Sequence, residues 1–184
     1  MFRSTRVRPS WRAKLAALLL PLLATALPAQ NREAVTLPPG AEDLQVPAGN
    51  VLSFHAYAIG VQVYRCDPVT LQWTLSHPYA QLYLDPGFHG WIGLHTGGPT
   101  WMTIAGSAVV GERLATATVD PTAIPWLLLA AHSTGGPGPL AATTFIQRVN
   151  TVGGRAPGYT GSPGEIAMVP YTAEYLFYRA QGPQ

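Results

Sequence analysis

The stretch HTGGPTWMTIAGSAVVGE, residues 95–112, determines how the whole chain is interpreted. It holds a histidine, a serine, a tryptophan and a glutamate, which are residue types found in active sites. However, Gly-Gly-Pro and Ala-Gly-Ser are turn signals, and the residues around them form short β-prone runs. The Gly-x-Ser-x-Gly motif of a serine hydrolase does not occur, because Ser107 is followed two residues later by Val109. We therefore interpret the stretch as strands and turns.

The same pattern of β-prone runs and turn residues continues from residue 51 to the C-terminus. No segment keeps a helical period over three turns. We expect strands at residues 51–58, 61–66, 71–76, 79–84, 91–96, 100–104, 108–119, 143–152 and 173–180. Ile59-Gly60 is expected to be a hairpin turn, and the apolar run 124–132 either a buried strand or a short helix.

These strands predict a single all-β domain at residues 50–184, either an antiparallel β-sandwich or a small β-barrel. The Gly/Pro-rich segments 135–139 and 153–164 are expected to be long loops, where β-domains often carry binding groups. Cys66 is the only cysteine. No disulfide can form within the chain, so its stability must come from packing.

The N-terminus has the basic, apolar and small-residue parts of a secretory signal peptide. Basic residues up to Lys14 precede the apolar run 15–26, which LPAQ follows. The run is shorter than the roughly 20 residues of a membrane span. We expect a leader at residues 1–29, no membrane span after its cleavage, and export to the periplasm or the extracellular space. Residues 30–49, rich in Pro, Gly and acids, are expected to form an extended arm.

Most of the basic charge lies in the predicted leader. It contains five of the eleven Lys and Arg residues and none of the nine acidic residues, which leaves a charge of −3 on the mature chain instead of the formal +2. Nucleic-acid binding requires a basic patch. We therefore expect no nucleic-acid partner.

Several blocks of the chain follow one another in a recognisable order. They are GVQVYRC (60–66), HTGGPTW (95–101) with GSAVVG (106–111), IPWLLL (124–129), FIQRVNTVGG (145–154) and VPYTAEYLFYR (169–179). In this order they resemble the DUF3455 family, exported proteins of bacteria and fungi with no established activity. The resemblance also implies a second cysteine in the loop before VPYTAEY. This chain has none between Gly153 and Glu165, so that loop is expected to lack a cross-link to Cys66.

The histidines give little support to a metal site. In one continuous strand His89 and His95 would point the same way, and Asp85 or Glu112 could supply a third ligand. Their spacing matches neither H-x-H nor HExxH. We expect isolated, hydrogen-bonded histidines, no metal and no other cofactor.

Arginines within apolar, β-prone sequence need an explanation. They are Arg65, Arg148 and Arg179. A guanidinium near a core must be paired, and one interpretation is a set of ion pairs that lock strands together. Candidate partners are Glu112, Glu174, Asp67 and Asp85. The other interpretation is that Arg148, near Gln147 and Asn150, points into a cleft and binds a carboxylate or similar anion, because its planar fork suits bidentate contact.

The leading hypothesis is an exported, non-enzymatic β-domain that binds a small molecule or an envelope or extracellular glycan. Trp101 follows a Gly-Gly-Pro turn, where its ring is expected to stand at the mouth of a cleft and stack on a sugar ring or flat ligand. The expected ligand contacts are His95, Trp101, Arg148 and Asn150.

Two other function classes remain open. An enzyme, either a hydrolase or a lyase, would use His95 as proton carrier with Glu112 or Asp85 as its acidic partner. A structural or partner-binding envelope protein would instead form a stable complex with envelope material.

Overall fold

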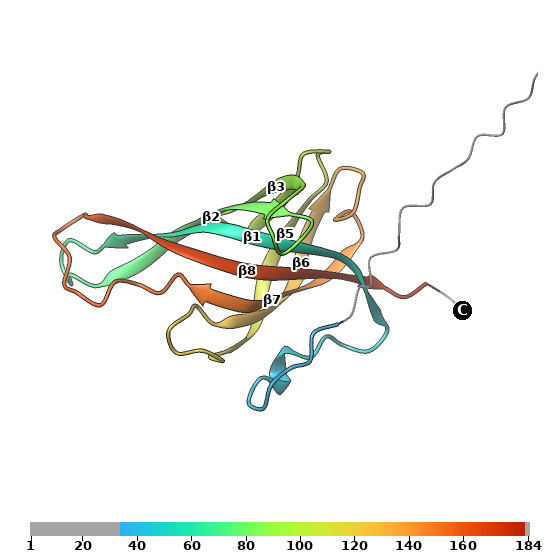
Figure 1. Ribbon diagram of the computed structural model, residues 1–184, viewed down its shortest axis with the longest axis horizontal. Helices are drawn as coiled ribbons and strands as arrows, with labels where there is room; N and C mark the ends of the chain where they lie inside the picture. The colour runs from blue at the N-terminus through green and yellow to red at the C-terminus, as the bar shows by residue number, and fades with distance from the viewer. Residues whose placement is uncertain (1–33, 183–184) are drawn as a thin grey trace, which may run out of the picture. The chain divides into compact units, whose positions relative to one another are not determined.

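The structure is a computed structural model and describes residues 34–182 (Figure 1). One antiparallel sheet closes into an eight-stranded barrel, in which the strands pair in chain order and β8 pairs with β1. The strands are β1 (Asn50–Cys66), β2 (Trp73–Tyr83), β3 (Trp91–Thr96), β4 (Thr100–Thr103), β5 (Ala108–Ala117), β6 (Trp126–Gly135), β7 (Thr143–Gly153) and β8 (Ile166–Ala180). The all-β prediction is confirmed, in its barrel form. The predicted leader lies outside the described residues, among which no helix has the length and apolar character to span a membrane.

β1 is one continuous strand of 17 residues, and the expected turn at Ile59-Gly60 is wrong. Gly60 pairs with Ala80 of β2 on one side and with Tyr171 of β8 on the other. A Cβ atom at position 60 would lie 2.2 Å from the backbone oxygen of Tyr79. Glycine therefore permits a close approach between two strands here and does not reverse the chain.

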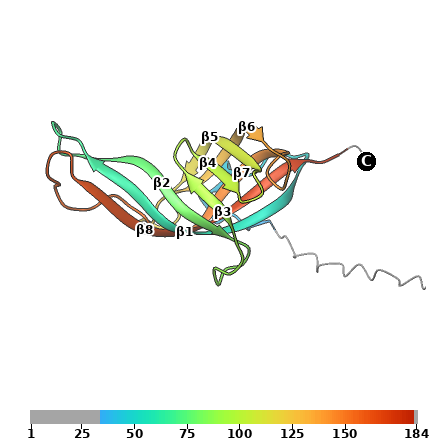
Figure 2. The same cartoon turned by 90° about the horizontal axis from the view of Figure 1, so that it is seen from above.

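The two neighbours of β1 are also longer than expected. The strands predicted at 71–76 and 79–84 are one strand, β2, in which Pro78 lies opposite Gln62. β8 starts at Ile166 instead of near residue 173, and its 15 residues pair along almost all of β1. Figure 2 shows β1, β2 and β8 continuing together beyond the shorter strands.

The apolar run 124–132 enters the strand β6 at Trp126 and does not form a helix. Leu127 and Leu129 belong to the apolar cluster inside the barrel, whereas Trp126 and Leu128 belong to a cluster on its outer face. Successive strand residues point to opposite faces of a sheet. Residues 126–131 are all apolar because this part of the strand is covered on both sides.

The larger apolar cluster fills the barrel interior. Trp101, Tyr175, Phe177 and Ile146 are among its large, fully buried members. The edges of Tyr175 and Phe177 approach the Trp101 ring, with centroid distances of 5.2 and 6.0 Å. Such edge-to-face contacts stabilise the interior beyond the burial of apolar area alone.

The second cluster lies on the outer face of β6, β7 and β8, beneath the N-terminal arm. The arm contains a short 3-10 helix, η1 (Glu42–Leu44), whose Leu44 is fully buried. Gln147 of β7 donates from Nε2 to the Leu44 oxygen at 2.7 Å, and Tyr178 of β8 donates to Gln147 Oε1 at 2.7 Å. The arm therefore folds back onto the barrel wall.

Cys66 ends β1 as a free, buried thiol. The loop between β7 and β8 is attached beside it without a cross-link. The Cys66 N–H donates to the Glu165 oxygen at 2.8 Å, and the Gly164 N–H donates to the Cys66 oxygen at 3.0 Å. Trp73 of β2 donates from Nε1 to the Tyr159 oxygen at 2.9 Å.

Candidate functional site

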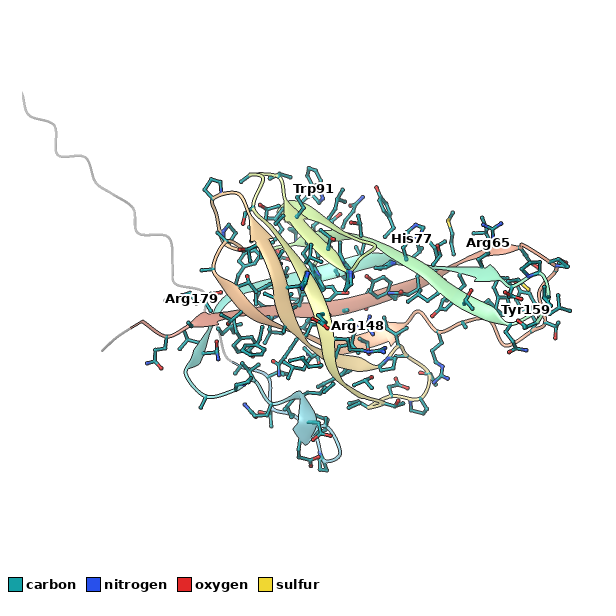
Figure 3. The ribbon with its side chains drawn as sticks, turned by 180° about the vertical axis from the view of Figure 1, so that it is seen from behind. Arg65, His77, Trp91, Arg148, Tyr159 and Arg179 are labelled. Carbon is teal, nitrogen blue, oxygen red and sulfur yellow. The ribbon has the colours of Figure 1, made fainter. Side chains whose placement is uncertain are left out.

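A cavity of about 520 Å³ enters the barrel. β1, β2, β3, β5, β6 and β7 all contribute to its lining. Its buried wall carries Gln62, Tyr64, His95, Ile124 and Leu129, and its exposed rim carries Leu75, Ser76, His77, Arg113 and Thr116. Figure 3 labels Arg148 within the barrel, far from Arg65 and Tyr159 at the outer end of the long strands.

Arg148 points into this cavity because of its place on β7. Ile146, two residues earlier, belongs to the interior cluster, and alternate residues of a strand share a face. Across the sheet Arg148 lies opposite Leu127 of β6 and Tyr175 of β8, which also face inward. The guanidinium is therefore carried on the inner side of the barrel wall.

The charge of Arg148 is not balanced by an acid. Its Nε and one terminal nitrogen donate to the Pro125 oxygen at 3.1 and 2.7 Å. Within residues 34–182 no carboxylate forms an ion pair with it. Burial raises the pKa of the nearby Tyr175 hydroxyl despite the positive charge of Arg148, so this phenol stays neutral and supplies no counter-charge.

The described residues that line the cavity include two arginines, Arg113 and Arg148, and no aspartate or glutamate. A cleft lined by one sign of charge with low-dielectric walls attracts ions of the opposite sign. The lining therefore favours an anionic occupant.

Gln62 and Trp101 each keep a buried hydrogen-bond donor without a partner. Both side chains are 1% exposed, and neither Gln62 Nε2 nor Trp101 Nε1 has an acceptor in the described structure. Buried donors are nearly always bonded, and leaving one unpaired costs about 1–3 kcal/mol. Because Gln62 lines the cavity, an acceptor atom inside it would satisfy this donor.

His95 lines the cavity as a neutral imidazole. Its pKa is lowered to about 3, chiefly by burial and in smaller part by the charge of Arg148, while the hydrogen bond with Thr100 opposes this change. Nδ1 lies 2.9 Å from the Thr100 oxygen. A carbonyl oxygen only accepts, so Nδ1 carries the proton and Nε2 is left as an acceptor. The ring is therefore uncharged at neutral pH.

Trp101 lies beside His95, but its expected place at the mouth of a cleft is wrong. The two rings stack with a centroid distance of 4.4 Å and an interplanar angle of 8°. The indole is only 1% exposed. Its strand, β4, pairs with β3 so that His95 and Trp101 are directly opposite and face inward. Gly98 and Pro99 of the Gly-Gly-Pro turn line the cavity, whereas the Trp101 ring is packed in the barrel interior.

Asn150 is not brought to Arg148, although the two are near in sequence. Its backbone has a positive φ of 48°, and the pairing of β7 with β8 shifts between Val149 and Val152. The side chain is exposed and donates to Glu174 Oε1 at 3.0 Å. Glu174 alternates with the interior residue Tyr175, so Asn150 lies on the outer face.

The acids considered as partners of His95 are engaged elsewhere. Asp85 lies 3.0 Å from His89, and Glu112 lies 4.0 Å from His132, both on exposed surface. The described residues bring no three metal-ligating side chains together. A proton-transfer pair built on His95 is therefore not assembled in this structure.

The other two arginines singled out in the sequence, Arg65 and Arg179, are exposed. Neither forms an ion pair with the proposed acids within the described residues. In contrast, Gln62 and Arg113, which sequence reasoning missed, both line the cavity.

Comparison with known families gives one match to this chain. Residues 47–179 match the model of DUF3455, described as a protein of unknown function. No curated protein and no solved structure matches the chain.

Proposed function

The chain belongs to DUF3455, a family of proteins of unknown function. We propose from its cavity that it is a non-enzymatic β-barrel that binds a small organic anion, and from its N-terminal sequence that it is exported. The anion places a carboxylate, or a group of like geometry, against Arg148. Gln62 Nε2 supplies a further donor from the buried wall.

The observation that carries this proposal is the uncompensated guanidinium of Arg148. Moving an unpaired charge out of water costs several kcal/mol, and proteins normally offset it with an opposite charge. Here Arg148 has a carbonyl oxygen as acceptor, from Pro125, but no acid. A bound carboxylate would supply the missing charge and accept two parallel hydrogen bonds.

Binding accounts for the site better than acid–base catalysis does. With a pKa of about 3, His95 neither holds a proton to donate at neutral pH nor takes one readily. Its Nδ1–H is used by the Thr100 oxygen. These properties suit an acceptor in the wall of a binding cavity, where Nε2 selects for a ligand group that donates.

The proposal is tested by calorimetric titration of the purified protein with octanoate and benzoate, each compared with its neutral amide. We expect the acids to bind and the amides to bind at least tenfold more weakly, because a hydrogen bond to a charged group contributes about 1.5–3 kcal/mol. Arg148→Gln should remove this preference, whereas Arg179→Gln, at an exposed position, should keep it. Equal affinity for acid and amide, or no binding of either, would refute the proposal.

Export is tested separately. Mass spectrometry of the protein recovered from the periplasm or the culture medium should find a new N-terminus at Gln30, after cleavage at Ala29. An intact N-terminus on protein confined to the cytoplasm would overturn this part of the proposal.

A further inference from the structure

We infer that the anion is a dianion, with one acidic group held by Arg148 inside the barrel, a second held by Arg113 at the rim, and an apolar spacer between them. This inference rests on the proposed function and names its ligand class.

The positions of the two arginines follow from the strand register. Arg148 of β7 lies opposite Leu127 of β6, and two residues further along β6, Leu129 lies opposite Arg113 of β5. Directly paired residues point to the same face, so both arginines lie on the side of Leu127 and Leu129. With about 4.8 Å between strands and about 3.4 Å per residue, their Cα atoms are roughly 12 Å apart.

The surface between the two arginines is apolar. Leu127 and Leu129 lie between them in the register, and Ile124 and Pro125 complete this side of the cavity. A methylene chain or a flat hydrocarbon would bury its area against them, at about 25 cal/mol per Å². A polar spacer would lose its hydrogen bonds to water there.

Arg113 is available for a second acid. Its side chain is exposed and lines the cavity, and within residues 34–182 no hydrogen bond or ion pair holds it. The adjacent Glu112 points to the opposite face, where its carboxylate lies 4.0 Å from His132. The rim therefore offers a positive group without a competing acid of its own.

The test is a series of straight-chain dicarboxylates from butanedioate to decanedioate, titrated beside the monocarboxylates of the same length. We expect the best dicarboxylate to bind at least tenfold more tightly than its monocarboxylate, with an optimum at an intermediate length. Arg113→Gln should reduce its affinity to about that of the monocarboxylate and should weaken monocarboxylate binding much less, because only the dicarboxylate has a second acid to place at the rim. Arg148→Gln should weaken both.

Arg65→Gln is the matched control, since Arg65 is an exposed strand arginine that does not line the cavity. A thermal melt of each variant shows that it is folded. If monocarboxylates and dicarboxylates bind equally well, or if Arg113→Gln has no effect on dicarboxylates, the dianion inference falls while anion binding stands. If neither class binds, the proposed function itself fails.

Discussion

Each side of the barrel wall carries a buried glutamine, and the two glutamines differ in their hydrogen bonding. Gln147, on the outer side beneath the arm, has both ends of its amide bonded, to the Leu44 oxygen and to the Tyr178 hydroxyl. Gln62, on the inner side, is equally buried, but its Nε2 has no partner in the described structure. The arm cluster is thus complete in itself, whereas the cavity wall keeps bonding capacity for another molecule.

Two charged groups, one on each side of the wall, differ in the same way. Glu174 on the outer face accepts hydrogen bonds from both His55 and Asn150, and the bond from His55 is the largest cause that lowers its pKa. Arg148 on the inner face has no acid beside it within the described residues. The outer polar groups Gln147 and Glu174 are thus paired, whereas Gln62 and Arg148 at the cavity keep an unpaired donor and an unbalanced charge. Changes on the outer side should therefore cost stability, and changes on the inner side should cost binding.

The largest expected effect is on the outer side. Leu44→Ala removes a fully buried side chain from the arm cluster and should lower the free energy of unfolding by about 2–5 kcal/mol. Urea denaturation measures this, and carboxylate affinity should not change. Val69→Ala, at an exposed position, should stay within about 0.5 kcal/mol of the wild type. A loss of affinity in Leu44→Ala would show that the two sides are coupled.

The next effect is a pH dependence that originates on the inner side. The pKa of His95 is about 3 in the folded protein, whereas its ordinary value is 6.5. Below pH 6.5 the imidazole of the unfolded chain therefore binds a proton, while that of the folded chain stays neutral. Stability should fall with pH by up to ~1.4 kcal/mol per unit, or about 2 kcal/mol between pH 6.5 and 5.

His95→Gln should flatten this part of the stability profile, whatever its effect at neutral pH. His89→Gln, which changes an exposed histidine, is the control and should keep the slope. If both variants follow the wild-type profile, His95 is not buried in its neutral form.

A smaller effect is expected for the paired glutamine. Gln147→Leu leaves the Leu44 oxygen and the Tyr178 hydroxyl without their partner and should destabilise the protein by about 1–3 kcal/mol. Combining it with Tyr178→Phe should cost less than the sum of the two single changes, since one hydrogen bond is counted in both. Additive costs would mean that these two residues do not interact.

The smallest effect on stability should come from the unpaired glutamine. Gln62→Leu removes a donor that has no partner, and its cost should lie within about 0.5 kcal/mol of zero, because no hydrogen bond of that donor is lost. Its carboxylate affinity should nevertheless fall. If Gln62→Leu destabilises the protein as much as Gln147→Leu does, the inferred difference between the two glutamines is wrong.

A strand could be predicted from the sequence where turns bound it at both ends. Prediction was less successful where a glycine lies inside a strand. Trp91–Thr96 was predicted residue for residue, between the Asp-Pro-Gly and Gly-Gly-Pro turns. At Gly60 the same residue type allows a close backbone approach, a property of the neighbouring strand that local sequence does not contain. Assuming a break there also hid that Ala58, Gly60 and Gln62 share one face, which is the pattern that would have placed Gln62 inside.

The site was predictable only in part for similar reasons. His95 and Arg148 do line one cavity, because each lies on the inner face of an ordinary alternating strand. Asn150 should share the face of Arg148 by the same alternation, but the register shift and its positive φ turn it outward. The place of Arg113 at the cavity depends on the register of β5 with β6 and of β6 with β7, and the residues around Arg113 do not determine that register.

The first and last strands of the chain are partners: Asn50 lies opposite Ala180, and the Gln181 N–H donates to the Gly49 oxygen. A ribosome that releases the chain from its N-terminus onward therefore supplies β8 last, and the ring cannot close before then. Until that moment β1 and β7 each present a row of unpaired backbone groups. Closure of the barrel must therefore wait for the C-terminal strand, however early the other strands pair with their neighbours.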